Sequence, residues 1–146
     1  MHKLIALLLL AAALLAPSAG LTHSHKRKSL EIVHPYTMET TKGTTTARVF
    51  MTIKNSGGAP ERLISAATPM AAKVELAVAD GAAKDAAFTI APGKSLVLGP
   101  KGGYLVMTGV KKAFTAYGDF KMALEFEKSG RVVVDVMVEE AAEGQK

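Results

Sequence analysis

Apolar and polar residues alternate along most of the chain between residues 29 and 138. The alternating apolar positions near the C-terminus are Met122, Leu124, Phe126, Val132, Val134, Val136 and Val138. A period of two is typical of a β-strand that buries one face, and no segment shows the period of an amphipathic helix. Strands are therefore expected over residues 29–37, 47–54, 61–67, 73–79, 120–127 and 130–138. Such a series of short strands predicts an all-β fold, an antiparallel sandwich or barrel.

The central segment, residues 88–112, adds three shorter strands to this series. Phe88 and Ile90 precede a Pro-Gly turn, Leu96 and Leu98 follow it, and a Gly-rich turn over residues 100–103 separates them from the run that starts at Tyr104. Pro and Gly interrupt strands in this way because they fit turns better than ladders. The segment predicts a β-meander whose loops are free to carry function. Asp80-Gly81 predicts a further hairpin turn.

The N-terminal residues differ in character from the rest. Residues 1–20 contain a basic start, an apolar run and small residues at their end, which is typical of a cleaved secretory signal peptide. The run is about 13 residues long, short of the roughly 20 that span a bilayer. Residues 21–28 are expected to form a flexible arm rich in His and Lys, and residues 139–146 a polar C-terminal tail.

Composition excludes several classes of protein. The chain contains no Cys, so disulfides, thiolate metal sites and Cys nucleophiles are excluded. Its formal net charge is +5, but the basic residues are scattered and aromatic residues make up only 5%, which argues against nucleic acid as a partner. No hydrolase, metalloprotease or nucleotide-binding motif is present, and we expect no enzyme activity.

Three motifs occur in an order that resembles one family. They are L-x-I-x-H-P-Y from Leu30, V-E-L from Val74, and I-x-P-G-x-x-L-x-L-x-P-x-G-x-Y from Ile90, which is followed by G-V-K at Gly109. In this order they resemble the PCuAC family of periplasmic copper chaperones. The resemblance covers residues 29–138 and implies a cupredoxin-like antiparallel Greek-key β-sandwich, which we expect to be monomeric and periplasmic.

The same resemblance implies a Cu(I) site made of His and Met side chains, and this chain departs from it. At the matched positions stand Ala77, a residue near Ala82, Tyr104 and Val106. Cu(I) is soft and prefers thioether, thiolate and imidazole ligands, so Ala and Val cannot replace them. A phenol with a pKa near 10 is also a poor ligand at neutral pH. We therefore expect the Cu(I) site to be lost.

The remaining Met residues do not obviously replace the missing ligands. Met107 is one residue out of register with Val106, so strand alternation predicts that it faces the core. Met51, Met122 and Met137 are also expected in the core, whereas Met70 stands in or near a loop, where it could be exposed.

The candidate metal ligands are therefore His23, His25 and His34, the imidazoles that follow the signal peptide. If cleavage follows Gly20, His23 is the third residue and could wrap Cu(II) with the free amine and amide nitrogens. If cleavage follows Thr22, His23 itself carries the amine and could form a histidine brace with His25 or His34. In the alternative interpretation His23 and His25 bind nothing specific and His34 has a structural role.

Two functions remain open after these observations. The first is an exported copper-handling protein, resembling PCuAC chaperones, in which metal binding has moved to the N-terminal histidines. Its cofactor would be copper, as Cu(II) at the arm rather than Cu(I), and its partner a periplasmic or membrane copper enzyme. The alternative is a metal-free pseudo-chaperone, a β-sandwich module that binds another protein.

Overall fold

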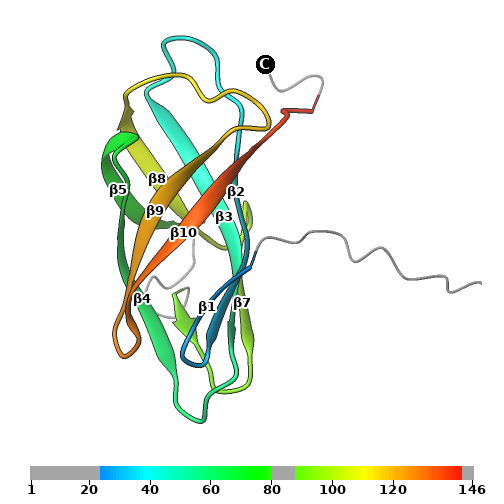
Figure 1. The fold of residues 1–146 in the computed structure, drawn as a ribbon, viewed down its shortest axis with the longest axis vertical. Helices are drawn as coiled ribbons and strands as arrows, with labels where there is room; N and C mark the ends of the chain where they lie inside the picture. The colour runs from blue at the N-terminus through cyan, green and yellow to red at the C-terminus, as the bar shows by residue number, and fades with distance from the viewer. Residues whose placement is uncertain (1–23, 80–87, 143–146) are drawn as a thin grey trace, which may run out of the picture.

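The computed structural model describes residues 24–79 and 88–142, and these form ten β-strands and no helix (Figure 1). The strands are β1 (Ser24–Arg27), β2 (Leu30–Met38), β3 (Thr46–Asn55), β4 (Glu61–Ala67), β5 (Ala71–Val78), β6 (Thr89–Ile90), β7 (Ser95–Leu98), β8 (Gly103–Val110), β9 (Asp119–Phe126) and β10 (Gly130–Glu139). The predicted all-β fold is confirmed. The expected signal peptide, His23, the Asp80-Gly81 turn and Ala82 lie outside the described residues. No described segment forms a helix that could cross a membrane.

Most strands join into one curled sheet in the order β5-β8-β3-β2-β10-β9-β4-β6, while β1 pairs with β2 and β7 with β3 (Figure 1). All pairs but one are antiparallel. The exception is β10, which runs parallel to β2, with Met137 opposite Tyr36. Non-consecutive neighbours such as β3 and β8 reflect the crossing connections expected of a Greek-key sandwich.

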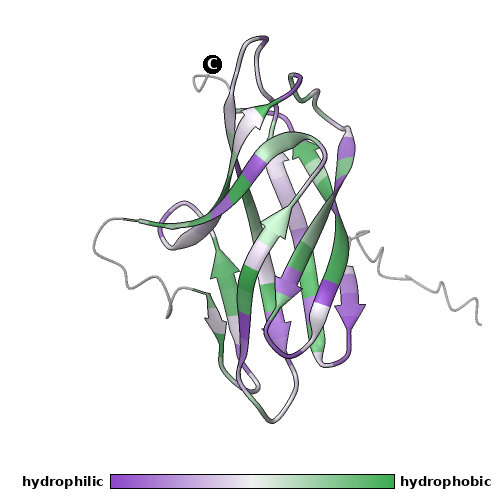
Figure 2. Cartoon of the chain, turned by 90° about the vertical axis from the view of Figure 1, so that its left-hand side faces the viewer, coloured by the Kyte–Doolittle hydropathy of each residue, from purple (hydrophilic) through white to green (hydrophobic). Residues whose placement is uncertain are grey.

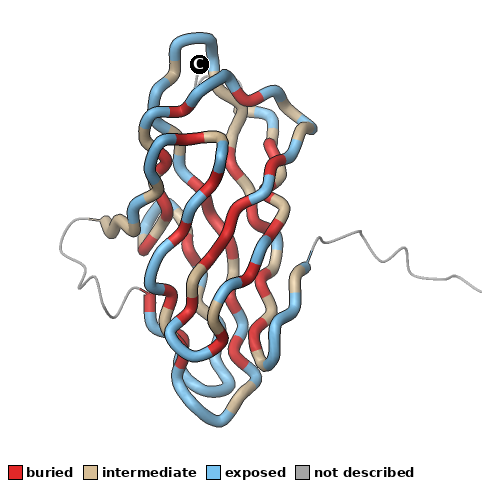
Figure 3. Tube along the Cα trace, turned by 60° about the vertical axis from the view of Figure 1, so that its left-hand side comes forward, coloured by how far each residue is buried: buried red, intermediate tan, exposed pale blue. Residues whose placement is uncertain are grey.

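The core lies inside this curled sheet. Buried and exposed positions alternate along the strands in Figure 3, and hydropathy alternates in the same way in Figure 2. The fully buried side chains include the predicted core positions Met51, Met107, Met122, Val134 and Val136. The prediction for Met137 was wrong, because Met137 alternates with the buried Val136 and Val138 and is only partly buried. Met70 is partly buried against the core.

Residues 24–27 form a strand, although the segment 21–28 was expected to be flexible. Ser24 pairs with Val33 and Arg27 with Leu30, and a turn at Lys28 and Ser29 joins the two strands. The four residues of β1 are exposed or only partly buried, so they have no apolar face from which a strand could be predicted. These residues form a strand because they pair with the edge of β2, and not because of a strand pattern in their own sequence.

Glu61 is a charged residue that the fold buries, with 5% of its surface exposed. Its carboxylate accepts hydrogen bonds from the backbone N–H groups of Arg62 (3.0 Å), Lys128 (2.9 Å) and Ser129 (2.8 Å). Burial by itself would raise the pKa of this carboxyl, but these hydrogen bonds outweigh it and hold the pKa below the ordinary value of 4.5. Glu61 thus ties the start of β4 to the β9–β10 turn.

We expect Glu61→Gln to lower the free energy of unfolding at pH 7 by about 1–3 kcal/mol, because an amide cannot accept all of these bonds. A carboxyl whose pKa is lowered by folding stabilises the protein above its unfolded pKa and loses that effect as the pH falls. The difference between parent and variant should therefore shrink below about pH 4.5. Urea unfolding from pH 7 to pH 3 measures it. Glu127→Gln is the control: it removes an exposed ion pair with Arg62 in the same turn region and should change the free energy of unfolding by no more than about 1 kcal/mol.

Candidate functional site

Strands β5 and β8 bring together the positions where the sequence predicted a lost metal site. Ala77 lies directly opposite Tyr104, and Glu75 lies opposite Val106. Tyr104 and Val106 alternate with the buried Leu105 and Met107, so both face outward. The predicted juxtaposition is therefore present, but within the described residues these positions carry no imidazole or thioether. Met107 is 0% exposed and points to the core, as predicted.

A row of rings occupies this outer face instead. We call His34, Tyr36, Phe50 and Tyr104 the aromatic row; successive ring centroids are 5.0, 5.4 and 6.5 Å apart. The row crosses β2, β3 and β8, and the Arg48 guanidinium lies 4.7 Å above the Tyr104 ring, a cation–π contact. Tyr104 is therefore a packed aromatic residue. The row runs from Tyr104 on β8, where the resemblance implies a Cu(I) ligand, to His34 on β2.

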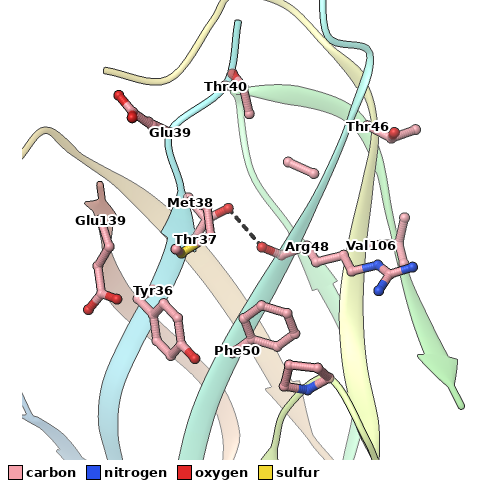
Figure 4. Close-up of a pocket in the computed structure, with 12 residues that line it drawn as sticks. Tyr36, Thr37, Met38, Glu39, Thr40, Thr46, Arg48, Phe50, Val106 and Glu139 are labelled. Carbon is pink, nitrogen blue, oxygen red and sulfur yellow. Dashed lines mark hydrogen bonds between the residues drawn. The ribbon is translucent and has the colours of Figure 1, made fainter. Parts of the chain in front are cut away.

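A groove of about 730 Å³ opens beside this row (Figure 4). It is lined by Tyr36, Thr37, Met38, Glu39, Thr40, Thr46, Ala47, Arg48, Phe50, Pro100, Val106 and Glu139. In Figure 4 the Arg48 side chain extends toward Val106, whereas Glu139 lies on the opposite side, beyond Tyr36. The groove thus combines an apolar, aromatic floor with opposite charges at its two sides.

His34, at the β2 end of the aromatic row, is held in an unusual conformation. Its φ angle is +51°, and it sits where the β2–β3 register shifts between Val33 and Tyr36. A non-glycine residue in this region costs about 1–3 kcal/mol. The bulge turns the side chain outward, where it stacks on Tyr36 and places Nε2 2.7 Å from Glu139 Oε1.

The contacts of His34 with Tyr36 and Glu139 orient its side chain but add little to the stability of the fold. The side chains of His34 and Glu139 are 47% and 38% exposed, and exposed ion pairs contribute about 0–1 kcal/mol. An aromatic stack adds about 0.5–1.5 kcal/mol, so the contacts roughly offset the backbone strain. Burial and the charge of Glu139 both raise the pKa of Tyr36 above its ordinary value of 10.0, so this neighbouring phenol is even harder to ionise than a free one.

His25 is engaged differently. Its Nε2 accepts a hydrogen bond from the backbone N–H of Asp135 (3.1 Å) and lies 3.8 Å from Asp135 Oδ2. Asp135 also pairs with Lys121 on β9. Because Asp135 and Glu139 are four residues apart on β10, His25 and His34 contact points separated by about 13 Å along that strand. The structure therefore does not bring these two imidazoles together.

Within residues 24–79 and 88–142, no group of three or more His, Cys, Asp or Glu side chains could hold a metal ion. The described part of the chain thus offers His34, backed by Glu139, as a single oriented imidazole. Sequence reasoning missed Glu139 and Arg48. Glu139 was assigned to the polar tail, and its contact with His34 depends on the parallel pairing of β10 with β2, for which the local sequence carries no signal.

Comparisons with known proteins agree with this fold. The family model described as an LpqE-like lipoprotein matches residues 30–138. The copper-bound PCuAC domain from PmoF2 is 25% identical, with a TM-score of 0.73, over 82% of this chain and 99% of that domain. The apo PCuAC domain from PmoF1 is 26% identical, with a TM-score of 0.71, over 82% of this chain and 100% of that domain.

A more distant structure shows the same architecture. Cu(I)-DR1885 from Deinococcus radiodurans is 20% identical, with a TM-score of 0.63, over 84% of each chain, and this similarity concerns the fold alone. No curated protein matches the sequence. The predicted resemblance to PCuAC domains, and with it the cupredoxin-like sandwich, is confirmed.

Proposed function

The chain belongs to the LpqE-like family, and from that membership we propose that it is an exported copper-handling protein whose metal binding has moved to the N-terminal histidines. It acts as a carrier and not as an enzyme. The observation that carries the proposal is the combination of a PCuAC fold with Ala77, Tyr104 and Val106 at the expected Cu(I) positions. The soft ligands are missing there, whereas His34, at the other end of the aromatic row, is an oriented, half-exposed imidazole.

The described part of the chain begins beside the strand that carries His34. Ser24, the residue after His23, pairs with Val33, the residue before His34. We propose that His23 binds Cu(II) together with His34, and that His25 contributes only if its hydrogen bond from Asp135 is broken. A free amine, an imidazole and amide nitrogens are good ligands for Cu(II). Cleavage after Gly20 would give an amine with His in third place, and cleavage after Thr22 a histidine brace.

Export follows from the same proposal. Residues 1–20 are proposed to be removed as a signal peptide, and the periplasm is the proposed compartment. The family description names a lipoprotein, but the chain contains no Cys to which a lipid could be attached. The proposed protein partner is a periplasmic or membrane copper enzyme that receives the ion.

The test is a Cu(II) titration of the exported protein, after intact mass has fixed its N-terminus. We expect one bound Cu(II) with several nitrogen couplings in its electron paramagnetic resonance spectrum. His23→Ala should abolish this signal, His34→Ala should weaken binding, and His25→Ala, the matched control, should change it least. Because protons must leave the ligands, binding should weaken as the pH is lowered. Parent-like binding by both His23→Ala and His34→Ala would contradict the proposal.

The groove favours a second candidate, a protein-binding module without metal. Arg48 forms no ion pair with the described carboxylates and lies over Tyr104 at one side of an apolar floor. This arrangement suits an extended peptide that places an apolar residue on Tyr36 and Phe50 and an acidic one on Arg48. A photo-crosslinking residue at position 106 should then capture a specific partner. The same residue at position 133, where Val133 is 48% exposed, is the control, and equal capture at both positions would exclude this function.

A further inference from the structure

The fold gathers at one end of the molecule basic residues that are scattered along the sequence. Four turns meet there: residues 28–29 between β1 and β2, 56–60 between β3 and β4, 91–94 between β6 and β7, and 127–129 between β9 and β10 (Figure 1). We call residues 26–31, 54–62, 91–95 and 127–130 the basal end. Its basic side chains are Lys26, Arg27, Lys28, Lys54, Arg62, Lys94 and Lys128.

Hydrogen bonds tie the four turns of the basal end to one another. These bonds run from the Asn55 N–H to the Lys94 carbonyl (2.9 Å), from the Ser56 N–H to the Ser29 carbonyl (2.9 Å) and from Lys28 Nζ to the Lys128 carbonyl (3.5 Å). The lysines of three different turns are therefore attached to one connected platform of backbone, and no rearrangement of the sheet is needed to bring their charges together.

The charges of the basal end are exposed and unbalanced. Lys28, Lys54, Lys94 and Lys128 are exposed and form no ion pair with a described carboxylate. The basal end contains seven basic and three acidic residues, whereas the rest of the described chain contains eight basic and seven acidic ones. The excess of positive charge in the described chain thus lies mainly at this end.

The three acidic residues do little to offset the exposed lysines. Glu127 is paired with Arg62 at 3.1 Å, and the Glu61 carboxylate is buried and accepts hydrogen bonds from three backbone N–H groups. Glu31 remains, opposite Lys54 in the register of β2 and β3. An anionic surface that approaches the basal end therefore meets a positive field.

The basal end offers charge but no apolar anchor. The large apolar side chains that the described chain exposes lie outside it: Ile64, Val97, Tyr117 and Val133. Protein–protein interfaces usually depend on buried aromatic or apolar anchors at their centre. An anionic bilayer needs none, because each Lys or Arg near its surface gains roughly fivefold in affinity from charge alone.

We propose that the basal end docks the protein on a membrane surface rich in anionic lipids, without insertion into the bilayer. β2 and β3 run between the basal end and the groove, since Thr40 and Thr46 line the groove at their far ends. A protein that stands on its basal end therefore holds the groove away from the lipid. This inference goes beyond the proposed function and does not depend on a metal.

The test is sedimentation of the exported protein with phosphatidylglycerol vesicles, with phosphatidylcholine vesicles as the uncharged control. We expect binding to phosphatidylglycerol alone, and we expect it to be lost as the salt concentration rises, because salt screens exposed charges. The triple variant Lys28→Gln, Lys94→Gln, Lys128→Gln should bind roughly 100-fold more weakly, since it removes three charges that each contribute about fivefold.

The matched control is Lys42→Gln, Lys111→Gln, Lys112→Gln, which removes three exposed lysines from the opposite end of the sheet. It should bind much as the parent does, and circular dichroism checks that both triple variants are folded. Equal losses in the two would mean that net charge and not the basal end drives binding, and would overturn the proposal. Equal binding to phosphatidylcholine would overturn it too. Retention on immobilised polyglutamate without binding to vesicles would indicate an acidic protein partner instead of a membrane.

Discussion

The triple variant Ala77→His, Tyr104→His, Val106→Met is expected to bind one Cu(I) that the parent does not retain against a strong Cu(I) chelator. The expectation rests on register. Ala77 and Tyr104 are directly paired across β5 and β8, and the Cβ atoms of such pairs are about 4.5–5.5 Å apart. Two imidazoles at this spacing can reach one ion, and residue 106 lies on the same face to add a thioether.

The scaffold should tolerate these changes because all three positions face outward. Ala77→Asn, Tyr104→Asn, Val106→Leu is the matched control, similar in size but without soft donors, and it should stay copper-free. Chelator competition under anaerobic conditions measures the gain, and circular dichroism checks folding. A folded triple variant that fails to bind would mean that the alignment with PCuAC domains is wrong at β8. Retention of Cu(I) by the parent would mean that ligands elsewhere had been overlooked.

Gly109→Ala is expected to lower the free energy of unfolding by roughly 2–5 kcal/mol, adding a backbone cost to a steric one. Gly109 has a φ of +65°, and a Cβ at this position would lie 2.7 Å from the Cβ of Ala72 on β5. The Ala72 methyl group is attached to the backbone and cannot rotate away, so β5 and β8 must separate. A domain of this size has about 5–15 kcal/mol in total, so this loss is large.

Gly93→Ala distinguishes the two contributions. Gly93 has nearly the same φ, +68°, but nothing lies within 4 Å of a Cβ there. It should show only the backbone cost of about 1–3 kcal/mol. Urea unfolding of both variants gives the difference, and equal losses would show that the contact with Ala72 does not constrain the sheet.

Much of the fold follows from residues that alternate strictly. Alternation predicts β9 from Met122 to Phe126 and β10 from Val132 to Val138. Register alone places Met107 in the core. Alternation says less where order comes from a partner: β1 has no apolar face and exists through pairing with β2, and the burial of Glu61 depends on N–H groups from a distant turn. Met137 is a different case, because it alternates with the buried Val136 and Val138, and alternation itself places it outward.

In the candidate site, too, some features could be predicted from the sequence and others depend on contacts with distant strands. The resemblance to a family predicted that Ala77 and Tyr104 would meet, and the strands place them opposite each other. The sequence could not show that His34 adopts a positive φ, or that Glu139 would reach it from the last strand. Arg48 gave no signal either, because its partner is the ring of Tyr104, which belongs to another strand.

The parallel contact between β2 and β10 has a consequence for how the chain is made. β2 is completed early in synthesis, whereas β10, its neighbour on one side, is the last strand to emerge from the ribosome. Until then residues 36–38 of β2 lack their partner on that side, since β1 covers only residues 30–33, and such open edges pair readily with other chains. Contacts between distant parts of a sequence also form slowly. The pairing of β2 with β10 is therefore expected to be a late step of folding, one that closes the sheet only after the rest of its strands exist.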